Sequence, residues 1–118
     1  MADIDPATEQ LVVAFMFGGA SLGALALGLL GRLRRLRRNG AFGVRTQKSM
    51  ASDEAWQDVH VKFAPFAFAI AATWAVTAVI PFVAGAKNMG PPVLAGIALG
   101  LILLVWGAIW SHREMDDG

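Results

Sequence analysis

Hydrophobic and polar positions along this chain fall into long blocks rather than into a short repeating pattern. Three blocks carry no charged side chain: residues 11–31, 63–85 and 92–110, with 21, 23 and 19 residues. A helix needs roughly 20 apolar residues to cross the hydrocarbon core of a bilayer. The pattern therefore predicts an all-α integral membrane protein with three transmembrane helices, forming a single membrane domain over residues 1–118.

The first block also has the length to be weighed as a secretory signal peptide. Such peptides begin with a positively charged region and have a short apolar core. Here the first ten residues hold Asp3, Asp5 and Glu9 and no Lys or Arg, and the apolar run that follows is long. We therefore expect a retained transmembrane span.

Composition narrows the function classes. Of the 118 residues, 56% are hydrophobic and 16% are charged, whereas about 25% are charged in an ordinary soluble domain. This composition argues against a soluble globular enzyme. The chain has no cysteine, which removes disulfides and cysteine nucleophiles. The three blocks also lack histidine, and ionisable residues within a membrane mark ion and proton paths. A pump or an ion-coupled transporter is therefore not expected.

Basic residues gather in the segment between the first two blocks. Residues 32–62 hold eight of the ten Lys and Arg. The positive-inside rule places this loop and the C-terminus in the cytoplasm and the N-terminus outside. Five arginines that directly follow the first span are expected to contact anionic lipid headgroups: Arg32, Arg34, Arg35, Arg37 and Arg38. A basic run beside a span is held most simply by lipid, so nucleic-acid binding is not expected.

Small and polar residues inside the blocks predict how the helices pack. Gly19 with Gly23, and Gly96 with Gly100, each form a GxxxG pattern, which lets helix backbones approach closely in lipid. The contacts could lie within this chain or between subunits of an oligomer.

Four further residues bear on the second span. Thr73 and Thr77 are expected to bond either across a helix interface or back to their own helix. Pro65 is expected in the first turn of the helix, where its missing N–H costs nothing, and Pro81 is expected to kink it.

The second half of the basic loop has a helix start signal. Ser52 is a good N-cap, and Asp53 and Glu54 place negative charge in the first turn. A helix from about Asp53 would run into the second span. Four residues would then share one face: Trp56, Val59, His60 and Phe63. We expect a short amphipathic helix at the membrane interface, with an ion pair between Asp58 and Lys62.

Candidate chemistry in the loop is sparse. His60 lies near Asp53 and Glu54 in the sequence, but spacings of seven and six residues do not form a ligand pair on one helical turn. There is no serine–histidine–aspartate arrangement, phosphate loop or zinc motif. We expect no metal, no cofactor and no enzymatic activity.

The stretch GVRTQKSMASDEAWQDVHVKFAP resembles the signature of the SdpI family of small bacterial membrane proteins. The family carries Gly-x-Arg-Thr after a span, a serine-rich turn, an acidic pair with a tryptophan, and an asparagine or histidine four residues later. The matching positions are Asn39, Gly43, Arg45, Thr46, Ser49, Ser52, Asp53, Glu54, Trp56 and His60. The resemblance covers about residues 11–110 and implies a location in the bacterial cytoplasmic membrane.

A physical role for the signature can be stated as a hypothesis. Arg45 would pair with Asp53 or Glu54 and fold the loop against the membrane, while Trp56 would anchor it at the level of the headgroups. These residues would either order the loop or form a docking surface for another protein.

Three functions follow as expectations. The first is a non-enzymatic membrane protein that acts through protein–protein contacts, as an accessory subunit of a larger membrane complex, with another membrane protein or its own copies as partner. The resemblance implies an alternative, because the member that names the family gives immunity to a secreted toxin and acts as a receptor that draws a repressor to the membrane. An oligomeric channel or transporter is the third.

Overall fold

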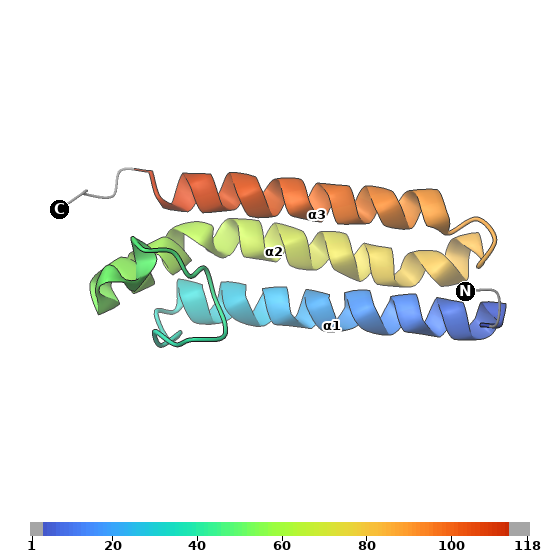
Figure 1. Ribbon diagram of the computed structural model, residues 1–118, viewed down its shortest axis with the longest axis horizontal. Coiled ribbons are helices and arrows are strands. Elements are labelled where there is room, and N and C mark those ends of the chain that lie inside the picture. Colours follow the sequence, from blue (N-terminus) through green and yellow to red (C-terminus); the bar gives the residue numbers. More distant parts are fainter. Residues whose placement is uncertain (1–3, 114–118) are drawn as a thin grey trace.

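The computed structural model describes residues 4–113 and contains three long helices and one short 3₁₀ turn (Figure 1). Helix α1 spans Pro6–Arg32, η1 spans Ser49–Ala51, α2 spans Asp53–Ala84 and α3 spans Gly90–Ser111. Residues 4–113 contain no strand. All three long helices are long and apolar enough to cross a membrane, so the all-α transmembrane prediction is confirmed.

Local chemistry explains where the helices begin. The Asp5 carboxylate accepts a hydrogen bond of 2.7 Å from the Thr8 N–H, and Pro6 occupies the first turn of α1, where no intrahelical donor is needed. The Ser52 side chain accepts from the Ala55 N–H at 3.0 Å. This N-cap starts α2 at Asp53, ten residues before the apolar run begins.

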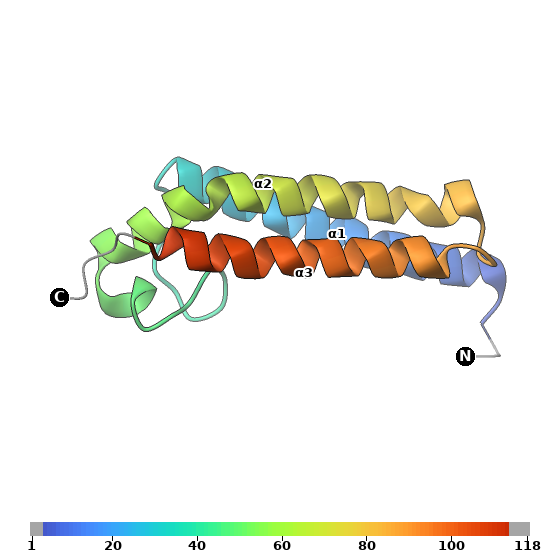
Figure 2. The same cartoon turned by 90° about the horizontal axis from the view of Figure 1, so that it is seen from above.

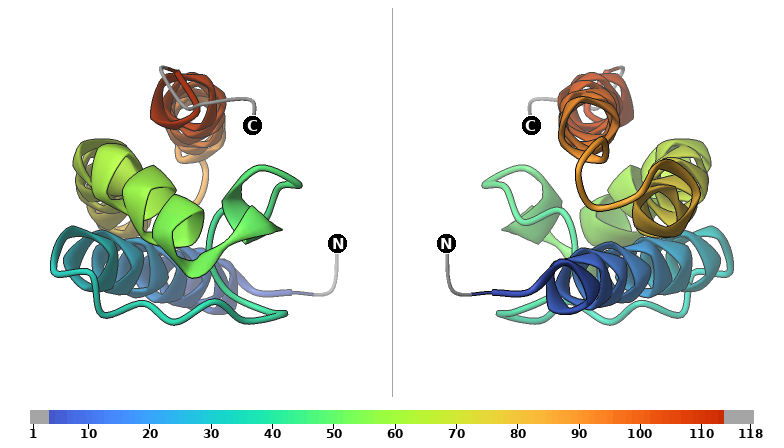
Figure 3. Two further views of the ribbon diagram at one scale, coloured as in Figure 1. Left: turned by 90° about the vertical axis from the view of Figure 1, so that its left-hand side faces the viewer. Right: turned by 90° about the vertical axis from the view of Figure 1, so that its right-hand side faces the viewer.

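Helix α2 is the centre of the bundle, with α1 and α3 packed on it (Figures 1 and 2). The helices α1 and α3, both within the described residues, do not pack against each other. Figure 3 shows the loop between α1 and α2 on the side where α1 and α3 face one another without touching. The bundle is therefore open along one side, and the loop occupies one end of that opening.

Glycines set the close contacts of α2 with its neighbours. Gly28 lies under the Phe68 ring, and Gly31 lies against the His60 backbone. Gly96 and Gly100 lie against Thr77 and Trp74 in the same way. A methyl group added at Gly19 or Gly23 would have nothing within 4 Å, so packing within the chain was the wrong interpretation for this pair. Gly19 instead lines an open groove together with Ala75 and Ala78 of α2.

The threonines of α2 bond within the helix, and one of its prolines lies where the helix bends. Thr73 and Thr77 bond back to the carbonyls of Ala69 and Thr73, each at 2.8 Å, so neither bonds across an interface. Pro65 lies well inside α2 rather than in its first turn, because the helix begins at Asp53. A proline in a helix interior removes a hydrogen bond and bends the helix. Figure 1 shows the first turns of α2 inclined to the rest of the helix.

Candidate functional site

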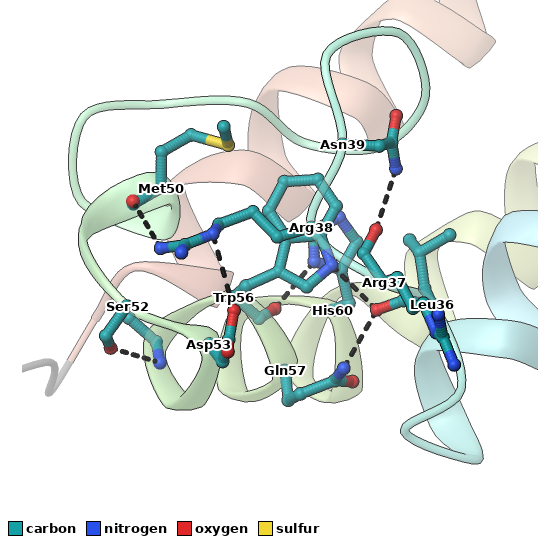
Figure 4. Close-up of polar contacts among 11 residues, drawn as sticks. Leu36, Arg37, Arg38, Asn39, Met50, Ser52, Asp53, Trp56, Gln57 and His60 are labelled. Atoms are coloured by element: carbon teal, nitrogen blue, oxygen red, sulfur yellow. Dashed lines mark hydrogen bonds and ion pairs between the residues drawn. The ribbon is translucent and has the colours of Figure 1, made fainter.

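The loop 33–52 and the first turns of α2 bring five of the signature residues together (Figure 4): Asn39, Ser52, Asp53, Trp56 and His60. Trp56 and His60 are 0% and 1% exposed, and their ring centroids are 4.2 Å apart. The Trp56 indole N–H donates to the Leu36 carbonyl at 2.8 Å, and the Gln57 amide donates to the same oxygen at 2.8 Å. These two bonds fasten the segment after α1 to the start of α2.

The expectation that Trp56 anchors the chain at the headgroups is therefore wrong. The apolar face of α2 that begins at Trp56 is real, but the loop covers it, and Val59 and Phe63 are buried with it. An indole N–H needs a hydrogen-bond partner when it is buried, and the Leu36 carbonyl supplies that partner inside the protein.

His60 is held in one neutral tautomer by two backbone groups. Its Nδ1 lies 2.7 Å from the Trp56 carbonyl, and a carbonyl only accepts, so Nδ1 carries the proton. Its Nε2 accepts a hydrogen bond of 2.8 Å from the Val44 N–H. A proton on Nε2 would face the Val44 N–H directly, so the charged form of His60 does not fit this arrangement.

Burial lowers the pKa of His60 below its ordinary value of 6.5, and nearby His112 acts in the same direction while the bond to Trp56 opposes it. His60 precedes the uncharged run 63–85. As the pH falls below about 6.5, the unfolded chain takes up this proton before the folded one, so stability falls with the pH. We expect the free energy of unfolding in detergent to decrease between about pH 7.5 and 5.5.

Two variants test the origin of this dependence. His60→Gln should flatten the change in unfolding free energy with pH, because the buried titrating group is gone. His112→Gln should retain most of it. An equal pH dependence in the wild type and in His60→Gln would assign the effect to other groups.

Gly43 allows the loop to approach His60 and Trp56. Its φ is +118°, and a Cβ at this position would lie 2.8 Å from the His60 Nε2 and 2.9 Å from the Trp56 ring. Glycine alone adopts this backbone region readily. The signature glycine is therefore required both by the backbone conformation and by the space.

Asn39 organises the turn that precedes Gly43. Its Oδ1 accepts from the N–H groups of Ala41 and Phe42 at 2.8 and 2.7 Å. Its Nδ2 donates to the carbonyls of Arg37 and Phe42 at 2.8 and 3.0 Å. One side chain thus satisfies four backbone groups of the turn, a role that asparagine is suited to.

Replacing Asn39 with Ala removes all four bonds and should open the turn. We expect the free energy of local opening to fall by about 1–2 kcal/mol, measured as faster amide hydrogen exchange at Ala41 and Phe42. Gln47→Ala, at an exposed neighbouring position, is the control and should leave exchange unchanged. Equal exchange in the two variants would contradict an organising role for Asn39.

Ser49 and Thr46 close the other side of the loop. Ser49 is 0% exposed, and its hydroxyl donates to the Val44 carbonyl at 2.7 Å and accepts from the Thr46 N–H at 2.8 Å. The Thr46 hydroxyl lies 2.7 Å from the His112 Nε2. The His112 Nδ1 lies 2.6 Å from the Ala108 carbonyl, and the hydrogen bond between Thr46 and His112 joins the loop to the end of α3.

The ion pairs differ from those expected. Asp53 is paired with Arg38 at 3.4 Å, and Arg38 also donates to the Met50 carbonyl at 3.0 Å (Figure 4). Arg45 forms no ion pair with any of residues 4–113, so the Arg45 hypothesis is wrong. Its segment turns back toward the helices, whereas Arg38 precedes the turn and lies over the start of α2.

The expected pair within α2 is also absent. Asp58 is bonded to Arg34 at 2.9 Å, and Lys62 donates to the Arg113 carbonyl at 2.9 Å. Each charge therefore links α2 to another segment rather than to its own next turn.

Several contacts of the site involve residues that the sequence analysis did not single out. Leu36 is buried at 5% exposure among exposed arginines, whereas Leu33 of the same run is 60% exposed, so the run itself did not indicate which leucine would be buried. Val44 packs against the core of Phe63, Ala67 and Ile70, although nothing in the loop sequence indicates this depth.

The buried polar side chains of the site are engaged in structural hydrogen bonds. The buried polar side chains Ser49 and His60 each bond to backbone groups of the loop, so neither is aimed into a cavity. Within residues 4–113 no three His, Cys, Asp or Glu side chains lie close enough to hold a metal ion.

These features define a polytopic α-helical membrane protein with a folded, partly buried connecting loop. The SdpI/YfhL protein family model matches residues 35–111, which comprise most of the loop together with α2 and α3. The chain belongs to this family and is a small multi-pass membrane protein. Neither the comparison with curated proteins nor the comparison with solved structures returned a match.

Proposed function

We propose that this protein is a non-enzymatic membrane protein that acts by docking, as an accessory subunit or binding partner of a larger membrane complex. The observation that carries the proposal is that the signature's polar groups at Asn39, Ser49 and His60 bond to the loop's own backbone. The side chains of Arg45 and Glu54 are exposed on the surface of this folded loop and the start of α2. We call this surface the platform.

We place this platform on the cytoplasmic side. The basic residues of segment 32–62 support that orientation through the positive-inside rule. Arg34 and Arg38 are occupied by Asp58 and Asp53. The side chains of the remaining arginines of the run have no bond to residues 4–113 and are the ones we assign to anionic headgroups: Arg32, Arg35 and Arg37.

Affinity purification from the native membrane in mild detergent tests docking. We expect a membrane protein to co-purify in a fixed ratio, and we expect Arg45→Glu or Glu54→Lys to reduce its recovery several-fold. Lys87→Glu, an exposed charge reversal in the turn between α2 and α3, is the control and should retain the partner. Recovery of this chain alone would contradict the docking proposal.

The family match favours a second candidate, an immunity or receptor role against a secreted membrane-active toxin. In that case a deletion strain should become sensitive to a specific membrane-active peptide, and expression of the chain should restore resistance. Unchanged sensitivity across the secreted peptides of neighbouring cells would count against this role and leave docking as the function to pursue.

A further inference from the structure

The part of the loop around Val44 lies beside the start of the second uncharged run. Val44 packs against Phe63, Ala67 and Ile70, which are in the first two turns of the uncharged run 63–85. Its N–H is bonded to the His60 ring at 2.8 Å. A bilayer that surrounds the start of this run therefore also surrounds the segment next to Val44.

The side of the bundle that holds the loop is not covered by a helix. Helices α1 and α3 do not pack against each other, and the loop lies on the open side between them (Figure 3). In Figure 1 the loop, coloured teal to green, turns back toward the helices before it enters α2. Its outward residues consequently face the surroundings of the protein.

The outward residues of the turn are uncharged. Gly40, Ala41 and Phe42 are all exposed, with 38% of Phe42 accessible. On either side of these three residues lie exposed arginines, Arg38 and Arg45. An apolar tip between cationic side chains matches the boundary of a bilayer, where acyl chains meet phosphates.

Part of the backbone of residues 40–42 is hydrogen-bonded within the protein and does not need water as a partner. Unpaired backbone groups are costly in hydrocarbon, so irregular structure at membrane depth needs internal partners. The Asn39 side chain bonds the N–H groups of Ala41 and Phe42 and the carbonyl of Phe42. Half of the six backbone groups of residues 40–42 are thereby satisfied, which suits the polar boundary of the bilayer better than its centre.

We propose that residues 40–42 insert into the lipid at the boundary between headgroups and acyl chains, with Phe42 as the anchor. The partner is a phospholipid surface, and the inference does not depend on the docking partner proposed above. Phe42 thus takes the anchoring role that the sequence analysis assigned to Trp56.

Because the chain has no cysteine, a single introduced cysteine can carry an environment-sensitive fluorophore. Phe42→Cys is labelled and reconstituted into vesicles of phosphatidylethanolamine and phosphatidylglycerol. Spin-labelled lipids then report depth, with the spin label near either the top or the end of the acyl chain. Glu54→Cys marks an exposed position at the start of α2, and Leu22→Cys, 68% exposed, marks the middle of a span.

We expect the label at Phe42 to emit at shorter wavelength than the label at Glu54. It should be quenched at least twofold more by the shallow spin label than by the deep one. The label at Leu22 should show the reverse order. The label at Ala41→Cys, in the same turn, should show the same emission and quenching as the label at Phe42→Cys. Because this variant keeps the Phe42 ring, it shows whether loss of that ring alters the fold of the turn.

Three results would overturn the proposal. The first is strong quenching of both turn positions by aqueous iodide, as at Glu54. The second is an absence of quenching by either spin-labelled lipid, which would mean that protein covers the turn. The third is stronger quenching by the deep label, which would place the turn away from the boundary.

Discussion

Replacing Gly43 with Ala is expected to lower the free energy of unfolding by about 2–4 kcal/mol. Two costs combine. The φ of +118° is unfavourable for any residue with a Cβ. The added methyl group would also lie 2.8 Å from the His60 Nε2 and 2.9 Å from the Trp56 ring. Neither neighbour can move freely, because His60 is bonded on both ring nitrogens and Trp56 is fully buried.

The measurement is equilibrium unfolding in mixed micelles, followed by tryptophan fluorescence. Gly40→Ala is the matched control, since nothing lies within 4 Å of an added Cβ there and its φ is not in the left-handed region. It should change the unfolding free energy by less than about 0.5 kcal/mol. If Gly43→Ala proved as mild as Gly40→Ala, the close approach of the loop to α2 would be wrong.

Trp56→Ala is expected to have the largest effect on this chain, about 3–5 kcal/mol of unfolding free energy. The indole is 0% exposed, stacks on His60 at 4.2 Å between centroids, and donates to Leu36. Its removal leaves a cavity and withdraws one of the two donors that fasten the segment after α1 to α2. The His60 ring would lose its stacking partner at the same time.

Two further variants separate packing from hydrogen bonding. Trp56→Phe fills most of the space but lacks the N–H, and should cost about 1–2 kcal/mol. Trp110→Ala truncates a tryptophan that is 46% exposed at the end of α3 and should cost much less than Trp56→Ala. Equal costs for the Trp56 and Trp110 truncations would show that the first is not a core residue.

Both expected results give the family signature a structural meaning. Five residues of the signature each hold one part of the loop in place in this structure: Gly43, Asn39, Ser49, Trp56 and His60. Substitutions at these five residues should therefore unfold the loop, whereas Arg45→Glu, at an exposed position, should leave it folded and affect only the docking proposed above.

The sequence by itself determined the membrane architecture. Uncharged runs of about 20 residues have essentially one structural solution in a bilayer, because every backbone group must be bonded within the helix. The start of α2 at Asp53 was also predictable, since an N-cap serine acts on groups only three residues away. The shared face of Trp56 and His60 followed from helical periodicity.

What covers that face was decided by the tertiary structure. The loop folds back because glycines at positions 31 and 43 let backbone and rings approach, and because Asn39 and Ser49 replace water as partners of its backbone. The bonds of Asn39 and Ser49 are local. The approaches of Gly31 and Gly43 to His60 join residues far apart in the chain, so local spacing carries no sign of them. The same holds for the ion pairs, where Arg38 rather than Arg45 reaches Asp53, and for Gly19 and Gly23, which no neighbouring helix covers.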